Sequence, residues 1–389
     1  SSLRKLGVSL PVRGVILLFF VFMPMFSNYA ALLTKDVLFA DAFLVLLVQT
    51  VKLVACGLPR RDANAERAGE QRPVLFVRHD WLGAMGSTFL RNGGLVFPLA
   101  ACVIAAAFCA WDAHVARRAA KQAGAAPSGT TPRFRWVGVL AVLALCLASN
   151  MYFTKVFMPA HDITPGSKRE ILSIPFQQTA RCLLAYPDDV TESELRAVSA
   201  VLDVENGVPN YDPRLADPVK DTSSPDLSGR LGPYMQAWLS MGMRHPGVYL
   251  DAWLNMIYGY FYPSDSNTIV CLTLNSPDAG GVALRQNPAL SDARLELHNR
   301  IYFTLRRIPG VGWLFYVDSV VWVFLLLLAA LVLRDGLRAA VPYMFFFGTL
   351  GVCLLSPKSG EIRYLMPILY ILPVMLGAAL LSPRKEEKP

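Results

Sequence analysis

Four short stretches of charged and polar residues border long apolar runs of this sequence. Ionisable side chains at the edge of hydrocarbon are costly unless they pair or face water, so they often mark a functional surface. The competing explanation is that such residues only anchor or cap helix ends. Cations fixed on one surface could hold the phosphate of an anionic headgroup. The four stretches are Thr34-Lys35-Asp36, Arg91-Asn92-Gly93-Gly94, His161-Asp162 and Lys358 to Arg363.

The elements that must position these stretches are predicted to be membrane spans. Hydrophobic residues make up 54% of the 389 residues, which is typical of a membrane protein. Seven clear spans are long enough to cross a bilayer, and 73–91 is a further weak crossing or re-entrant segment. We therefore expect an all-α polytopic membrane protein with about seven to eight transmembrane helices. The clear spans are 13–33, 37–57, 94–111, 136–157, 311–333, 338–355 and 364–381.

Charge distribution predicts the orientation of these spans. Segment 158–308 carries a net charge of −4, whereas the rest of the chain carries +12. Basic residues concentrate beside spans on the cytoplasmic side, so this segment is predicted to be extracytoplasmic. The basic excess gives no sign of nucleic-acid binding. We expect an N-terminal transmembrane bundle at 1–157, an extracytoplasmic helical segment at 158–308, and C-terminal transmembrane hairpins with a cytoplasmic tail at 309–389.

The extracytoplasmic segment has mainly helical patterns. Apolar spacing near 3.6 predicts a helix over 168–186, in which Pro175 delimits or kinks the chain. Thr191-Glu-Ser-Glu194 is a capping box that predicts a helix to about Leu202. Further helices are expected at 230–244, 246–260 and 291–307, and 206–229 is expected to form a loop.

Other chemistry is poorly represented in the sequence. Asp41 and Asp318 are intramembrane carboxylates close enough to the interface for hydration to explain them. Most cysteines lie in or beside spans, and spacing does not establish whether Cys182 and Cys271 pair. No zinc spacing, phosphate-binding glycine loop or nucleophile elbow occurs, so we predict no metal site and identify no cofactor.

Five motifs carry a resemblance that covers nearly the whole chain. They resemble an uncharacterised family of Gram-positive polytopic membrane proteins that is similar in layout to the GT-C glycosyltransferases. The resemblance implies a multi-helix fold with an active site on the outer face, a polyprenyl-phosphate sugar as donor and a cell-envelope acceptor. The motifs are Tyr29…Thr34-Lys35-Asp36-Val-Leu-Phe-Ala40, Leu90-Arg91-Asn92-Gly93-Gly94, Ile174-Pro-Phe-Gln177-Gln178-Thr-Ala-Arg181, Tyr258-Gly-Tyr-Phe-Tyr-Pro263 and Glu361-Ile-Arg363-Tyr-Leu-Met-Pro367.

The mechanism that the resemblance implies is displacement at a sugar anomeric carbon. A carboxylate would deprotonate the acceptor hydroxyl while cations stabilise the departing lipid phosphate. Asp36 is the expected base or the partner that orients Lys35. The other expected roles are phosphate contacts from Lys35, Arg91, Arg363 and Arg181, and substrate-binding contacts from Asn92, Gln177, Gln178 and Glu361.

Glycosyltransferases of this class usually carry their catalytic carboxylate in the first outer loop. This chain begins at Ser1, and its first outer loop, Phe26 to Thr34, contains no acidic residue. We therefore expect an N-terminally incomplete sequence that lacks the usual catalytic carboxylate, and enzymatic activity only in the full-length protein. Two alternatives stay open: a lipid-linked glycan polymerase or ligase, and a non-enzymatic transporter or scaffold.

Overall fold

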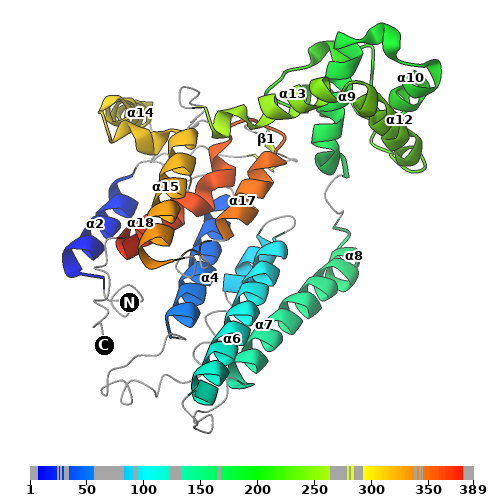
Figure 1. The fold of residues 1–389 in the computed structure, drawn as a ribbon. Helices are drawn as coiled ribbons and strands as arrows, with labels where there is room; N and C mark the ends of the chain where they lie inside the picture. The colour runs from blue at the N-terminus through cyan, green and yellow to red at the C-terminus, as the bar shows by residue number, and fades with distance from the viewer. Residues whose placement is uncertain are drawn as a thin grey trace.

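The fold comes from a computed structural model, which describes residues 8–23, 26, 29, 35–56, 83–90, 94–122, 133–163, 168–262, 278–279, 282–283, 292–336, 340, 343 and 345–379. Its described elements are helices apart from two-residue strands β1 (Asp278–Ala279) and β2 (Val282–Ala283), which pair antiparallel. The all-α class is therefore confirmed. The helices form a bundle and a separate helical lobe, as Figure 1 shows.

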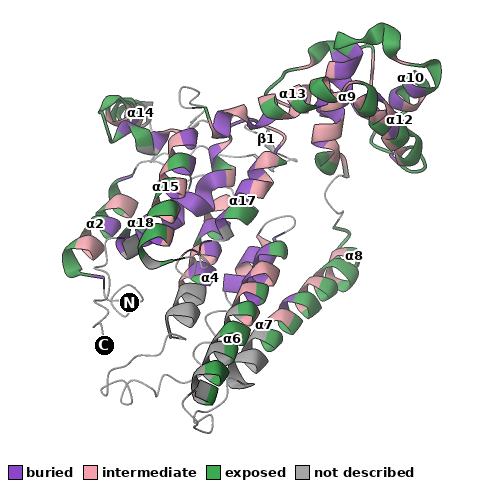
Figure 2. Ribbon diagram, viewed as in Figure 1, coloured by how far each residue is buried: buried purple, intermediate pink, exposed green. Residues whose placement is uncertain are grey.

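The bundle is built around α18 (Ile362–Ala379), which is apolar on all sides and almost completely buried. A helix that is hydrophobic all round needs neighbours all round. Its neighbours are α4 (Asp36–Cys56), α15 (Val317–Asp335), α17 (Phe345–Leu354) and α2 (Leu10–Phe22). Figure 2 shows the buried surfaces concentrated on α18 and the faces turned toward it.

A helical hairpin extends the bundle on the α4 side. It consists of α6 (Val96–Gln122) and α7 (Arg133–Tyr152), and α7 continues through a π-helix at Phe153–Phe157 into α8 (Met158–Ala160). α6 packs on α4 and α17, while α7 packs mainly on α6. The outer side of α7 exposes apolar side chains such as Leu140 and Met151.

Two described helical stretches are long and apolar enough to cross a membrane, Leu140–Ala160 and Val317–Arg334. Leu10–Phe22 and Ile362–Gly377 are apolar but shorter. The total of seven to eight spans thus stays a prediction. The first expected span, 13–33, is interrupted, because α2 ends at Phe22 and Met23 is extended. Pro24 follows Met23, and a residue before proline is disfavoured in a helix.

The helical lobe covers residues 168–257 and has its own hydrophobic core. Its central helix is α9 (Ser173–Ala185), preceded by a 3-10 turn at Lys168–Leu172, with Pro175 in the first turn of α9. The other main helices are α10 (Glu192–Ser199), α12 (Leu231–Arg244) and α13 (Pro246–Ile257). Short helical turns η4 (Pro187–Asp189), η5 (Val208–Asn210) and α11 (Asp217–Lys220) connect them, and η6 (Tyr258–Tyr260) follows α13.

The sequence signals in the lobe are confirmed at three points. Thr191 and Glu194 form the predicted capping box at the start of α10, although that helix ends at Ser199 and does not reach Leu202. Pro246 begins α13 after α12 ends at Arg244. The expected loop at 206–229 is mostly irregular but includes η5 and α11.

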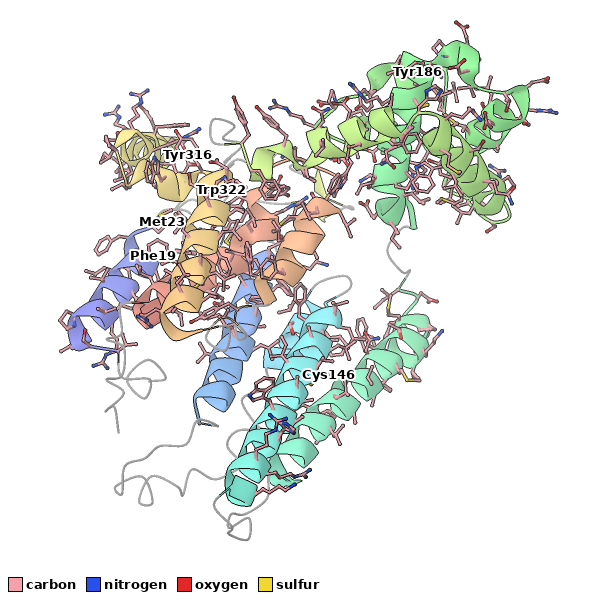
Figure 3. All side chains as sticks on the ribbon, viewed as in Figure 1. Phe19, Met23, Cys146, Tyr186, Tyr316 and Trp322 are labelled. Carbon is pink, nitrogen blue, oxygen red and sulfur yellow. The ribbon has the colours of Figure 1, made fainter. Side chains whose placement is uncertain are left out.

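The element before α15 is α14 (Asp292–Arg307), which leads through η7 (Gly312–Phe315) into α15. Its bounds agree with the predicted helix at 291–307. In Figure 3, the labelled side chains of Tyr316 and Trp322 lie at the upper part of α15, near η6 and α14. Trp322 Nε1 donates to the Phe261 carbonyl at 2.9 Å, which ties α15 to the segment that follows η6.

Candidate functional site

The candidate site lies around the loop between α17 and α18, which we call the α17–α18 loop (residues 355–361). Ser356 Oγ accepts from the Lys358 amide at 3.2 Å and donates to the Lys358 carbonyl at 2.8 Å. Gly360 has φ +64°, a left-handed conformation that glycine adopts without strain. Lys358 Nζ forms an ion pair with Glu361 Oε2 at 2.7 Å. The loop is therefore a compact turn whose own cation and carboxylate neutralise each other.

The α17–α18 loop is joined to the lobe by backbone hydrogen bonds. The Ala216 amide donates to the Pro357 carbonyl at 2.7 Å, and the Ser359 amide donates to the Arg214 carbonyl at 2.8 Å. Leu215 and Lys358 form an antiparallel bridge between them. The bundle and the lobe therefore meet through a short backbone ladder, although neither segment belongs to a named strand.

Gln177 organises the lobe side of this ladder. Its side chain is completely buried in α9, and its Nε2 donates to the carbonyls of Asp212 at 3.1 Å and Leu215 at 2.6 Å. The predicted role of Gln177 was substrate binding. In the structure its amide nitrogen fixes the segment that pairs with the α17–α18 loop.

The described part of the predicted motif Tyr258 to Pro263, Tyr258 to Tyr262, lies on the other side of the same loop. The Gly259 amide donates to Ser359 Oγ at 2.8 Å. Tyr260 is fully buried, and its hydroxyl donates to the Lys358 carbonyl at 3.4 Å and accepts from the Glu361 amide at 3.3 Å. Burial raises the pKa of Tyr260 well above its ordinary value, so the hydroxyl stays neutral and can both donate and accept a hydrogen bond.

A charged group forms where α4 and α18 begin. These two helices pack more extensively than any other described pair, and Asp36 and Arg363 lie in their first turns. The charges of Glu361 and Asp36 both act on Arg363. Positive partial charge at helix N-termini favours anions, which stabilises the Asp36 carboxylate and would favour a bound phosphate.

Two tyrosines complete this group. Tyr29 is 5% exposed, and the charges of Glu361, Arg363 and Asp36 all act on its hydroxyl. Tyr302 of α14 is 2% exposed and also interacts electrostatically with Tyr29. We call Tyr29, Asp36, Tyr302, Glu361 and Arg363 the junction cluster. It draws on three stretches that are distant in sequence, which are 29–36, 302 and 361–363.

Within the junction cluster, Arg363 has the greatest access to solvent. Its side chain is exposed, and its guanidinium lies 5.2 Å from the ring centroid of Tyr364 and donates to the Tyr364 hydroxyl at 3.4 Å. Glu361 is only 13% exposed and is engaged by Lys358. No described residue forms an ion pair with Asp36, which is half-buried. Arg363 and Asp36 are therefore the cluster members best placed to contact a ligand.

The remaining predicted site residues are dispersed. Lys35 precedes Asp36 and is exposed. Arg91 and Asn92 lie outside the described residues, so their expected contacts stay predictions. Gln178 joins α9 to its neighbours, because its Nε2 donates to the Tyr249 carbonyl at 3.1 Å and its Oε1 accepts from Trp238 Nε1 at 3.1 Å.

Arg181 belongs to a separate polar group in the lobe. It forms an ion pair with Asp251 of α13 and lies 6.0 Å from the ring centroid of Tyr211. Burial raises the pKa of Tyr211, and Arg181 opposes this increase. The Tyr211 hydroxyl and Gln177 Oε1 are buried without a hydrogen-bond partner among the described residues. This group could bind a polar molecule such as water, but it is distinct from the junction cluster.

The described residues hold no group of three or more His, Cys, Asp or Glu side chains suited to a metal ion. Cys182 is a completely buried thiol, and Cys271 lies outside the described residues. Asp318 is 1% exposed and accepts from Ser319 Oγ at 3.4 Å, whereas Asp41 is exposed on α4. Cys182, Asp318 and Asp41 do not join the junction cluster.

Sequence reasoning did not assign roles to Tyr29 or Tyr302. Tyr29 stood in one of the five motifs, so its motif was a usable signal. Tyr302 lies between polar and apolar residues of an amphipathic helix, where nothing in the local pattern distinguishes it from a packing residue. Its position became apparent only from the way α14 packs on the bundle.

The fold and the site thus define a helical protein whose lobe is joined to a bundle by the α17–α18 loop, with a charged cluster beside that joint. The model of the family of unknown function DUF6020 matches residues 128–388, and the chain belongs to this family. That range includes the lobe, α14 and the α17–α18 loop. No curated protein and no solved structure matches the chain.

Proposed function

We propose that this protein is a multi-pass protein of the cell membrane that transfers a sugar from a polyprenyl-phosphate donor to a cell-envelope acceptor on the extracytoplasmic face. The observation that carries the proposal is that Asp36 and Arg363 lie in the first turns of α4 and α18, two helices that pack on each other, so that the charge of Asp36 acts on Arg363. A carboxylate and an exposed cation near two helix N-termini are what transfer from a phosphate-linked sugar requires.

In the proposed reaction, Asp36 accepts the proton of an acceptor hydroxyl. The hydroxyl oxygen then bonds to the anomeric carbon as the bond from that carbon to the donor phosphate breaks. The phosphate oxygen leaves with the bonding electrons, and Arg363 stabilises its charge. Lys35 adjoins Asp36 in the sequence and adds a second cation, and Arg91 is the further phosphate contact of the proposal.

The α17–α18 loop has a supporting role in this proposal. Lys358 and Glu361 neutralise each other at 2.7 Å, so they hold the loop that leads into Arg363 and leave the arginine to contact the donor. Tyr29 and Tyr302 line the same cluster as buried hydroxyl groups. The separate group around Arg181 and the buried amide of Gln177 act on the lobe instead of on the phosphate.

The direct test is transfer of a labelled sugar from polyprenyl phosphate by the full-length protein in proteoliposomes. Arg363→Ala and Asp36→Asn should each lower the transfer rate roughly a hundredfold or more, because each removes a group that acts on the reacting atoms. Arg196→Ala is the matched control, since Arg196 is an exposed lobe arginine whose side chain donates only to the Glu192 carbonyl within its own helix. Unchanged transfer by Arg363→Ala and Lys35→Ala would contradict the assignment.

A further inference from the structure

Helix α14 has an exposed apolar side next to a buried one. At 3.6 residues per turn, Leu297 and Ile301 lie along one side of α14, and Tyr302 lies about 100° around the helix from Ile301. Leu297 is 57% exposed and Ile301 46% exposed, whereas Tyr302 is 2% exposed. Figure 2 shows α14 as mainly exposed surface at the edge of the molecule. Leu297 and Ile301 therefore form an exposed apolar stripe beside the buried face of α14, and Ile308, which is 42% exposed, follows directly after the helix.

The inner face fixes α14 to the bundle. The Tyr302 ring packs edge-to-face on Phe315 of η7, with ring centroids 5.0 Å apart. Tyr302 also belongs to the junction cluster through its interaction with Tyr29. α14 therefore stands between the candidate site and whatever medium covers its apolar stripe.

The short connection between α14 and α15 places α14 beside the N-terminal end of α15. After Arg307 the chain turns at Gly310, whose φ is +82°, and the Gly312 amide donates to the Ile308 carbonyl at 2.7 Å. A Cβ at Gly312 would lie 2.2 Å from the Arg306 carbonyl oxygen, so only glycine fits this turn. α15 then begins at Val317 and contains one of the two described stretches able to cross a membrane.

The direction of α14 agrees with a position at a membrane surface. Figure 1 shows α14 nearly end-on, whereas α15 runs in the plane of the picture, so the two helices run in different directions. If α15 crosses a bilayer, α14 lies along the bilayer plane at the point where α15 enters. Trp313, which is 65% exposed, lies in the same turn, and tryptophan is enriched at such interfaces.

Arginines flank the apolar stripe. Arg300 and Arg307 project from one edge of it, and the Arg300 side chain is 74% exposed and pairs with Glu296 at 3.3 Å. Arg306 lies on the opposite side of the helix, where its guanidinium stacks 4.9 Å from the ring centroid of Tyr316. An apolar stripe with arginines at its edge complements acyl chains below anionic phosphates.

We propose that α14 lies along the outer surface of the membrane, with Leu297 and Ile301 at the acyl boundary and with Arg300 and Arg307 on the phosphates of anionic lipids. The inference rests on the proposed membrane location but not on sugar transfer. Because Tyr302 is on the inner face of the same helix, α14 then separates the junction cluster from the lipid surface.

The test uses single cysteine variants of the full chain in proteoliposomes, labelled with a membrane-impermeant maleimide. Ile301→Cys should react at least tenfold more slowly than Glu296→Cys, although both side chains are exposed in the structure. The unsubstituted protein sets the background from native cysteines. Equal labelling of the two variants in a protein that sediments with the vesicles would overturn the inference while leaving the membrane location intact.

Lipid composition distinguishes a membrane cover from a protein cover. Protection of Ile301→Cys should be stronger in vesicles containing phosphatidylglycerol than in phosphatidylcholine vesicles. Adding Arg300→Gln and Arg307→Gln should weaken the anionic preference by roughly fivefold for each arginine. Protection that is independent of lipid charge, or that persists in short-chain detergent at low protein concentration, would mean that another protein or a second copy covers the stripe, and would refute the proposal.

Discussion

The contact between Gly259 and Gly360 allows a sharp test of how the lobe is joined to the bundle. A Cβ added at Gly259 would lie 2.9 Å from both the Cα and the amide nitrogen of Gly360. Backbone atoms cannot give way as the end of a flexible side chain can, so Gly259→Ala must push the α17–α18 loop away. The loop would then lose its hydrogen bond from the Gly259 amide to Ser359 Oγ and would strain the ladder to Arg214 and Ala216.

The magnitude follows from these contacts. Overpacking a tight site costs about 1–3 kcal/mol. Each hydrogen bond lost adds about 1 kcal/mol. We expect Gly259→Ala to favour separation of the loop from the lobe by about 2–4 kcal/mol. At 1.4 kcal/mol per tenfold change, the exchange rate of the protected amides should rise roughly 30-fold to several-hundred-fold.

Hydrogen exchange measured by mass spectrometry is the suitable assay, with peptides covering 212–216 and 356–361. Gly247→Ala is the matched control, because a Cβ at Gly247 in the first turn of α13 meets nothing within 4 Å. Equal exchange in these peptides for Gly259→Ala and Gly247→Ala would show that the close contact between Gly259 and Gly360 is not required. The backbone joint inferred for this loop would then be wrong.

Two further predictions concern the lobe. Gln178→Leu should lower the stability of the lobe by about 2–3 kcal/mol in urea unfolding, because it leaves Trp238 Nε1 unpaired and removes the hydrogen bond to the Tyr249 carbonyl, whereas Gln236→Leu at an exposed position of α12 should change it little. Equal effects of the two leucines would contradict the bridging role of Gln178. The Arg244 guanidinium lowers the pKa of Glu194 from 4.5 to about 2. The pair therefore stabilises the lobe fully above pH 4.5, and its contribution of about 2 kcal/mol, reduced for the solvent access of Arg244, is lost as the pH falls from 4.5 to 2. This part of the acid dependence should be absent from Glu194→Gln, and its persistence there would assign it to another group.

The lobe helices were predictable because their ends carry local signals. The capping box at Thr191 and the start of α13 at Pro246 each depend on a few neighbouring residues. The end of α10 was less predictable, because Ala200 to Leu202 continue the apolar pattern of the helix. The local sequence therefore does not mark the helix end, which depends on tertiary contacts. In the bundle, Pro24 indicates the end of α2, but the predicted span was based on hydropathy, which takes no account of proline.

The site was harder to predict because its contacts use backbone groups. The ladder between 214–216 and 357–359 consists of backbone amide and carbonyl groups, which are common to nearly all residues. No pattern of residue types therefore predicts it. Gln177 and Gln178 are neighbours in a motif that suggested one polar surface. Successive residues of a helix point about 100° apart, so the two side chains face different neighbours. Gln177 donates to the segment 211–216, whereas Gln178 joins α12 and α13.

The charges of the α17–α18 loop thus divide into two roles that mutations can separate. Lys358 is paired with Glu361 and lies in the ladder with Leu215, so changing it should loosen the joint between lobe and bundle. Arg363 is exposed at the start of α18 and within reach of the charge of Asp36, so changing it should act on a bound anion while leaving the joint in place. If the loop served only to anchor a helix end, the two substitutions would have the same consequences. Under the proposed function, hydrogen exchange responds to Lys358 and sugar transfer responds to Arg363.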